Sequence, residues 1–342
     1  MSYLITIDGG TTNTRTLLWK NDEVIASASR EVGAKNTAIA SSPPSASAAH
    51  ENPLKAAVTS CLEEIMEKAG VTYEDISGVA ASGMLTSNVG LVEIPHLIAP
   101  VTAEQLAKAI RPILLEDVCP LPIHFVPGIK NGVPEITTDN FEQMDMMRGE
   151  EAEVYAILKD HPVNKSTLLI LPGSHNKFIS VNASGAVTGC LTTISGELLS
   201  VISRHTILAN SVKQKFASEE SYDKEMVLLG ARTAAANGLG RTCFSGRILS
   251  TFVTKDEMQI ANFLLGAVLQ GDIEAYQNSS ALSLDSNADI IIAGKNPLRQ
   301  AIIDILKDTD PDIDITEYLP APGKPMSGCG AKYLYELYKT FC

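Results

Sequence analysis

The chain of 342 residues is too long for one ordinary hydrophobic core and fits two domains. Its composition, 45% hydrophobic and 20% charged, is that of a globular protein, and no apolar run approaches the about 20 residues that span a bilayer. The formal net charge of -13 argues against broad binding to nucleic acids or acidic membranes, so an anionic ligand needs local donors.

The first part of the chain predicts three strands, a loop, a helix and a further strand. The strands are expected at Leu4–Ile7, Thr14–Trp19, Val24–Ala28 and Ile76–Ala81. Residues 34–50, rich in Ala, Ser and Pro with no apolar period, predict a mobile loop. A helix is expected at Leu54–Ala69, because Pro53 suits its first turn and Gly70 its end.

The rest of the chain continues the alternation of helices and strands. Helices are expected at Glu150–Leu158, Glu197–Ile207, Glu257–Tyr276 and Met326–Tyr338, and a buried strand at Asp289–Ala293. Alternating strands and helices predict an α/β fold with layered sheets.

A short stretch near the start is echoed in the middle of the chain. L4-I-T-I-D-G-G-T-T-N-T resembles T167-L-L-I-L-P-G-S-H-N-K, so that Gly10 aligns with Gly173 and Asn13 with Asn176. Two strand-like segments follow in both places. A chance match is one explanation, and a duplicated fold with two phosphate-binding turns is the other.

The first of these turns has the chemistry of an anion site. Gly9 and Gly10 allow a tight turn and close approach of the backbone to a ligand. The side chains of Thr11, Thr12 and Asn13, with backbone N–H groups, can surround an anion. Asp8, at the end of a buried strand, can hold Mg²⁺ through water, because hard cations prefer oxygen ligands. A plain hairpin turn is the alternative.

These residues resemble the first phosphate motif of the sugar kinase/actin/Hsp70 superfamily, with Pro172-Gly173-Ser174 as the second motif and 290–296 as the adenosine motif. Within that superfamily the chain is similar to the 2-dehydro-3-deoxygalactonokinase family. The motifs that carry this likeness, in an order and spacing that fit from end to end, are S82-G-M-L-T-S-N-V-G90, M147-R-G-E-E151, L171-P-G-S-H-N-K177 and S195-G-E-L198.

The resemblance implies ATP and Mg²⁺ as cofactors and a sugar acid, 2-dehydro-3-deoxy-D-galactonate, as acceptor. It places the nucleotide on Gly9, Gly10, Thr11, Thr12, Asn13, Arg15, Gly173, Ser174, Ala293, Gly294 and Asn296, and the metal on Asp8. It places the acceptor on Ser87, Asn88, Arg148 and Glu151. His175 and Lys177 follow the second motif, facing either the phosphates or solvent.

Glu150 is the candidate catalytic base, because related kinases place an acid directly after a glycine at a helix start. Two first-turn acids that complement a helix dipole are the alternative, and Glu151 is the competing base. Arg148 is the candidate clamp for the substrate carboxylate, since a guanidinium can donate two parallel hydrogen bonds. A surface arginine is the alternative.

We therefore expect two ribonuclease-H-like α/β domains, 1–150 and 151–342, with the active site in the cleft between them and the last helix able to pack back on the first domain. Glu150 would deprotonate a terminal hydroxyl and Asp8 would anchor the metal. A kinase for another sugar or sugar acid, an Hsp70- or actin-like ATPase and a phosphatase-like hydrolase are the rivals. A homodimer is left open.

The cysteines favour a reducing compartment. Cys61, Cys119, Cys190, Cys243, Cys329 and Cys342 are spread along the chain without a CxxC pair, so neither a zinc site nor a disulfide framework is expected. The start, MSYLITID, has a strand pattern rather than that of a secretory signal. A cytoplasmic protein is the simplest expectation.

Overall fold

The computed structural model describes residues 2–40 and 52–342. The strands are β1 (Tyr3–Gly9), β2 (Thr14–Lys20), β3 (Glu23–Arg30), β4 (Ile76–Gly83), β5 (Leu97–Ile98), β6 (Arg111–Leu115), β7 (Cys119–Phe125), β8 (Ile129–Lys130), β9 (Met146–Met147), β10 (Thr167–Leu171), β11 (Asn176–Val181), β12 (Val187–Thr193), β13 (Asp289–Ile292) and β14 (Ile315–Glu317). The α-helices are α1 (Ala34–Ala40), α2 (Pro53–Ala69), α3 (Ala103–Lys108), α4 (Glu150–Asp160), α5 (Ser195–His205), α6 (Lys224–Asn237), α7 (Leu239–Phe252), α8 (Glu257–Asn278), α9 (Leu298–Thr309) and α10 (Met326–Lys339). The short 3₁₀ turns are η1 (Tyr73–Asp75), η2 (Met84–Thr86), η3 (Phe141–Gln143) and η4 (Ile207–Asn210).

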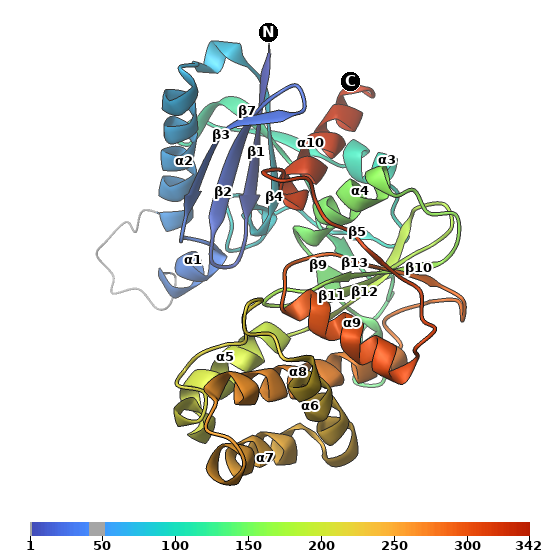
Figure 1. The fold of residues 1–342 in the computed structure, drawn as a ribbon. Coiled ribbons are helices and arrows are strands. Elements are labelled where there is room, and N and C mark those ends of the chain that lie inside the picture. Colours follow the sequence, from blue (N-terminus) through green and yellow to red (C-terminus); the bar gives the residue numbers. More distant parts are fainter. Residues whose placement is uncertain (1, 41–51) are drawn as a thin grey trace.

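Two mixed sheets are built on the same plan (Figure 1). One has the order β3-β2-β1-β4-β7-β6 and the other β12-β11-β10-β13-β14. In each, three consecutive antiparallel strands are followed by a parallel strand beside the first: β4 beside β1, and β13 beside β10. The α/β class is confirmed, and the short sequence echo marks the corresponding places of the two sheets.

Helix α2 covers one face of the first sheet. Asn52 Oδ1 accepts a hydrogen bond from Leu54 N at 3.0 Å, Pro53 takes the first turn, and Gly70 ends the helix at a φ of 64°. The φ of Gly70 is positive, a conformation that glycine adopts without steric cost. The predicted helix is thus confirmed with both of its end signals.

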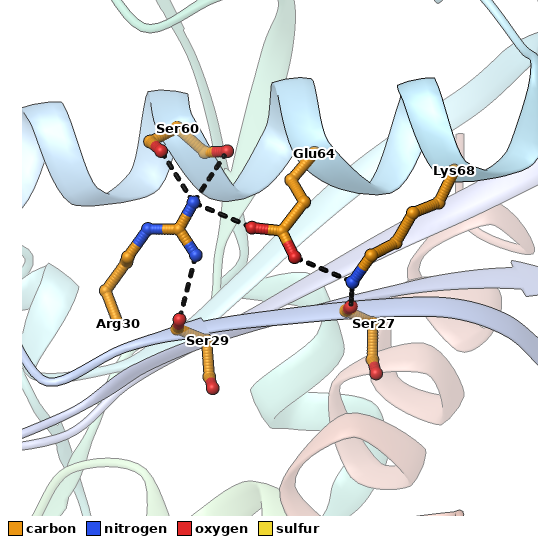
Figure 2. A network of polar contacts seen from close by, with 6 residues as sticks. All are labelled: Ser27, Ser29, Arg30, Ser60, Glu64 and Lys68. Atoms are coloured by element: carbon orange, nitrogen blue, oxygen red, sulfur yellow. Dashed lines mark hydrogen bonds and ion pairs between the residues drawn. The ribbon is translucent and has the colours of Figure 1, made fainter.

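Glu64 and Lys68 of α2 and Arg30 of β3 form a polar network at the β3 edge of that sheet (Figure 2). Lys68 Nζ donates to the Ser27 carbonyl at 2.9 Å, and Arg30 Nη1 donates to the Ser29 carbonyl at 2.9 Å. Glu64 bridges the two cations at 2.7 Å and 2.6 Å. Because carbonyls on an edge strand otherwise invite another strand to pair, this network closes the edge at β3.

Helix α10 lies on the other face of the first sheet and packs against α4, whose apolar side chains share a core with the second sheet. Gly328 of α10 lies against Leu17, where a Cβ would come within 2.5 Å of Leu17 Cδ1. Tyr335 Oη donates to the Ser77 carbonyl at 3.0 Å. Gly330 of α10 lies against Ala152 of α4, so a side chain at Gly330 would clash with α4. The last helix therefore contacts the first sheet, while the expected boundary at residue 150 stays a prediction.

One segment expected to be a loop is a helix. The Gly33 amide donates to Asn36 Oδ1 at 3.0 Å, and the amides of Ala34 and Lys35 donate to the carbonyls of Gly10 (3.2 Å) and Thr11 (2.9 Å). Helix α1 thus packs its first turn on backbone, which explains why its sequence shows no apolar period. Residues 41–50 of the expected loop lie outside the described residues.

Helices α5 to α8 gather at the end of the molecule away from β1 (Figure 1). Their apolar side chains share a core with the second sheet, with Phe178, Phe263 and Ile292 at its centre. The expected helix 197–207 begins at Ser195 and ends at His205, followed by η4. Within residues 2–40 and 52–342, no helix has both the length and the apolar surface needed to cross a bilayer.

Candidate active site at the two glycine turns

The first turn joins β1 to β2. Its Gly10 amide donates to the Asn13 carbonyl at 2.8 Å, and Thr11 and Thr12 are exposed. A Cβ on Gly9 would lie 2.4 Å from Leu85 Cγ, so only glycine fits there. Within the described part of the chain, no acceptor is present for the backbone N–H groups of Thr11, Thr12 and Asn13. Such amides can bind an anion.

The second turn, Pro172–His175, joins β10 to β11. Its Gly173 amide donates to Asn176 Oδ1 at 2.8 Å, so an asparagine three residues on holds the glycine in both turns. Asn176 Nδ2 donates in turn to Asp272 Oδ2 at 2.6 Å, and Ser195 Oγ donates to Asp272 Oδ1 at 2.5 Å. Burial raises the pKa of Asp272, and these two donors oppose that shift. Asp272 was not identified from the sequence as a site residue. Its one signal in the sequence is that an acid stands on the apolar face of α8.

A helix starts directly against each turn, after the third strand. A Cβ on Gly33 would lie 2.5 Å from the Gly10 carbonyl oxygen, and one on Gly196 would lie 2.6 Å from that of Gly173. The amide of Glu197 donates to the Ser174 carbonyl at 3.3 Å, as that of Lys35 does to Thr11. The repeat therefore extends from the strands and turns to the helix starts.

Carboxyl groups gather beside the first turn. Asp8 Oδ2 accepts a hydrogen bond from Ser327 Oγ at 2.9 Å. Burial raises the pKa of Asp8, the charge of Glu150 adds to that, and Ser327 and Arg15 lower it. Burial, with Asp8 and Glu150 nearby, raises the pKa of Glu153 to about 8. Glu153 was missed from sequence, although it lies three residues after Glu150 on the same face of α4.

Glu150 and Glu151 point in different directions. Glu150 is partly exposed, and its Oε2 accepts a hydrogen bond from the Arg148 amide at 3.1 Å. Glu151 is 0% exposed; its Oε2 accepts from the Gly149 amide at 2.7 Å, and its Oε1 has no partner among the described residues. Burial raises the pKa of Glu151 to about 8, with Glu150 adding to the shift. The side chain of Glu151 therefore faces the interior, and its contact with the acceptor stays a prediction.

Arg148 is occupied by the protein itself. Its Nη1 donates to the carbonyl of Thr86 at 2.6 Å and to the hydroxyl of the same residue. Its Nη2 donates to the Ile94 carbonyl at 3.0 Å and lies 3.2 Å from His96 Nδ1. Burial and the charge of Arg148 lower the pKa of His96 to about 4. The guanidinium thus fastens the segment between Thr86 and His96, rather than lying open to a substrate carboxylate.

The two expected acceptor residues differ in exposure. Ser87 is buried, and its hydroxyl donates to the Met84 carbonyl at 2.8 Å. Asn88 is exposed. They follow η2, next to the Thr86 that Arg148 holds. The side chain of Asn88 is therefore the more accessible of the two.

The end of β13 lies against the second turn. Gly294 has a φ of 99°, and a Cβ there would lie 3.1 Å from Pro172 Cδ. Asn296 Nδ2 donates to Glu219 Oε1 at 3.0 Å, and the Ala293 amide donates to the Ile170 carbonyl at 3.0 Å. The expected adenosine segment is therefore next to the expected second phosphate turn.

An apolar cavity of about 180 Å³ lies beside this segment. Its lining residues come from α5, α8, the start of α9 and two loops: Gly196, Leu199, Ser203, Phe216, Ala217, Ala261, Leu265, Pro297 and Leu298. Ser203 is the one side chain with a polar group among them. The cavity's place between Gly196 and Pro297 puts an apolar slot next to the second turn, which no sequence motif indicated.

A larger groove of about 630 Å³ lies on the flank of the first sheet, between β2, β3 and residues 320–325. Arg15 is the expected site residue that lines it. Among residues 2–40 and 52–342, no three His, Cys, Asp or Glu side chains come together to hold a metal ion by themselves.

The chain is similar to known proteins along most of its length. A profile of the 2-keto-3-deoxy-galactonokinase family matches residues 8–319. The protein of Rhizobium meliloti (strain 1021) named probable 2-dehydro-3-deoxygalactonokinase DgoK1 is 26% identical over 200 residues, which is 57% of this chain and 60% of that protein's own length. The 2-dehydro-3-deoxygalactonokinase of Escherichia coli (strain K12) is 23% identical over 290 residues, 85% of each chain.

A solved structure from Sinorhizobium meliloti, described as that of a putative 2-dehydro-3-deoxygalactonokinase protein, covers 99% of both chains with a TM-score of 0.67 and 20% identity. Component A of the (R)-2-hydroxyglutaryl-CoA dehydratase of Acidaminococcus fermentans covers 99% of both chains with a TM-score of 0.50 and 14% identity. These two likenesses concern the fold.

Proposed function

This chain belongs to the 2-keto-3-deoxy-galactonokinase family, a family of sugar-acid kinases, and we propose that it phosphorylates the terminal hydroxyl of 2-dehydro-3-deoxy-D-galactonate with ATP. The observation that carries the proposal is the pair of matched turns, each with a glycine amide held by an asparagine and a helix start packed on its backbone. Paired glycine turns suit a polyphosphate.

The nucleotide would be held mainly by backbone. The N–H groups of Thr11, Thr12 and Asn13 would contact the phosphates, with Arg15 adding positive charge. Gly9, Gly10, Gly173 and Ser174 would let the backbone of the two turns come close to them. The adenine ring would enter the apolar cavity beside Ala293, Gly294 and Asn296, whose about 180 Å³ suits a base rather than a whole nucleotide.

Asp8 fits a Mg²⁺ ion that is shared with the phosphates. Its carboxyl group has a pKa raised by burial and by Glu150, so a cation would offset the repulsion between these acids. When bound, the ion neutralises charge on the phosphates. The Ser327 hydroxyl, which donates to Asp8 at 2.9 Å, fixes the orientation of the carboxylate.

Glu150 would accept the proton of the attacking hydroxyl. It is partly exposed at the start of α4 and electrostatically coupled to Asp8, whereas Glu151 faces the interior. Glu153 replaces Glu151 as the rival base, because it too is close to Asp8. Burial raises the pKa of Glu153 to about 8. Glu150 stands directly after Gly149 at the helix start, where related kinases carry the acid, so we assign the base to Glu150.

The acceptor would lie against η2 and Asn88. We propose that Arg148 orders this segment through Thr86 and Ile94, which replaces the clamp on the substrate carboxylate expected from sequence. A residue with this role acts on acceptor binding through the segment that it holds.

The compartment is also a proposal. All six cysteines are unpaired, and three of them, Cys61, Cys119 and Cys190, are buried in the core. Free thiols in these positions suit a reducing cytoplasm.

A screen of deoxy-keto sugar acids with ATP, followed by ADP release and by the position of the new phosphate, tests the function. We expect the highest kcat/KM with 2-dehydro-3-deoxy-D-galactonate and a 6-phosphate product. Fast ATP hydrolysis that ignores every sugar acid would favour an Hsp70- or actin-like ATPase instead.

A further inference from the structure

The segment just before the proposed base is bonded to both sheets. We name Asp145–Arg148 the strap. On the side of the second sheet, Asp145 Oδ2 accepts from the Thr192 amide at 2.6 Å and Asp145 Oδ1 accepts from the Thr192 hydroxyl at 2.9 Å. Thr192 belongs to β12, so the strap begins on the sheet that carries the second turn.

Lys177 adds a second bond on this side. Its Nζ donates to the Met146 carbonyl at 2.9 Å and to the Thr192 hydroxyl at 2.7 Å. Lys177 directly follows Asn176, which holds the Gly173 amide. One side chain therefore links the strand that leaves the second turn to the backbone of the strap.

The other end of the strap is bonded to the first half of the chain. Arg148 donates to the Thr86 carbonyl at 2.6 Å and to the Ile94 carbonyl at 3.0 Å, and its own amide donates to Glu150 at 3.1 Å. Gly149 lies against Gly83, where a Cβ would come within 3.2 Å of the Gly83 Cα. Movement of the strap must therefore move Glu150 and the Thr86 end of the acceptor segment together.

Lys177 has an unusual environment for a lysine. It is 6% exposed, and among the described residues no carboxylate lies within ion-pair distance of its Nζ. Its two acceptors are the Met146 carbonyl of the strap and the Thr192 hydroxyl of β12, so its bonds join the strap to β12.

We propose that Lys177 is a positioning residue that couples the second turn to the acceptor site: a nucleotide that orders the turn also orders the strap, and with it Glu150 and Thr86. The inference rests on the proposed function, because it takes the nucleotide to bind at this turn. It predicts that ATP and the sugar acid bind cooperatively, by about fivefold or more in affinity. By linkage, the same factor applies in both directions.

The experiment measures the Kd of 2-dehydro-3-deoxy-D-galactonate by calorimetry, with and without a saturating non-hydrolysable ATP analogue. We expect the ratio of the two Kd values to fall from fivefold or more in the wild-type protein to near one in Lys177→Met. Lys177→Arg should recover part of it. Lys307→Met, which removes an exposed lysine of α9, should keep the wild-type ratio.

Folding is checked by circular dichroism and thermal melting, and Thr192→Val provides a second route if Lys177→Met does not fold. That change removes the hydroxyl shared by Lys177 and Asp145, and it should lower the ratio as well. A folded Lys177→Met or Thr192→Val with the wild-type ratio overturns the proposal, as does an active wild-type enzyme with a ratio of one. A wild-type protein that phosphorylates no sugar acid contradicts the proposed function instead.

Discussion

Ser327 at the start of α10 donates a hydrogen bond of 2.9 Å to Asp8 at the end of β1, so the last helix of the chain orients an acid of the first strand. Gly328 packs on Leu17 in the same turn, which fixes the helix start on the sheet. The position of Asp8 is therefore set by both ends of the chain.

Asp8→Asn should abolish phosphoryl transfer and leave the fold intact. The amide oxygen can still accept from Ser327, but it carries no charge to hold a cation. Turnover over a range of Mg²⁺ concentrations, with a thermal melt of the same sample, measures both effects. Asp139→Asn, on the exposed surface, is the matched control. Near-normal turnover of Asp8→Asn at ordinary Mg²⁺ would rule out the metal assignment.

Gly196→Ala should raise the KM for ATP. Its Cβ would lie 2.6 Å from Ser174 Cα, so the second turn must move. Gly240→Ala is the control, because nothing lies within 4 Å of its Cβ and alanine favours a helix by about 0.5–1 kcal/mol. The test is to measure the KM values for ATP and for the acceptor in both variants. An unchanged KM for ATP in a folded Gly196→Ala would show that the nucleotide does not bind at this turn.

Arg148→Ala should raise the KM for the acceptor about tenfold or more and lower the melting temperature, with little change in the KM for ATP. The substitution removes the hydrogen bonds that the charged guanidinium donates to Thr86 and Ile94, each worth about 1.5–3 kcal/mol. Arg148→Lys should rescue little, since one ammonium cannot reach both carbonyls at the angles of the guanidinium. Equal rises in both KM values would mark Arg148 as a general packing residue.

Glu151 should make the protein less stable as the pH rises. The pKa of Glu151 is about 8 in the folded chain, and its ordinary value is 4.5. Between these two pH values the folded state binds one proton more than the unfolded state at this residue. The free energy of unfolding therefore falls as the pH rises, by up to about 1.4 kcal/mol per pH unit. Melting curves from pH 6.5 to 8 are compared between the wild-type protein and Glu151→Gln, so that contributions common to both, such as those of His96 and Glu153, cancel. Glu151→Gln should show a shallower decline than the wild-type protein. Parallel declines would show that Glu151 is ionised in the folded state.

The sequence predicted the core strands around both turns and the helices α2, α4, α5, α8 and α10, because these depend on local patterns: apolar runs, a proline at a helix start and glycines in tight turns. It gave no prediction for β6, β7, α6, α7 and α9. It failed at α1, whose first turn packs on the backbone of Gly10 and Thr11 and so leaves no apolar period. The internal repeat could have predicted α1, because a helix follows the third strand in both halves: α1 after Gly33 and α5 at Gly196.

The roles of single polar residues were harder to predict. Arg148 and Glu151 stand in the expected motif, yet where they point depends on partners far along the chain, such as Thr86 and Ile94. Asp272 and Glu153 belong to no motif, and only the packing of α8 and α4 brings them to the turns. A local motif identifies candidate site residues, whereas their burial and their contacts with distant parts of the chain decide what each side chain can do.

The proposed role of Glu150 is to take the proton of the acceptor hydroxyl. The most direct measurement is kcat at saturating ATP and acceptor for Glu150→Gln, Glu151→Gln and Glu153→Gln, each checked for folding. Positioned base catalysis contributes about 10²–10⁴-fold, so kcat of Glu150→Gln should fall by that order with the KM for ATP little changed, and the other two variants should lose much less. A nearly active Glu150→Gln beside a severely impaired Glu153→Gln would contradict the account and make Glu153 the base.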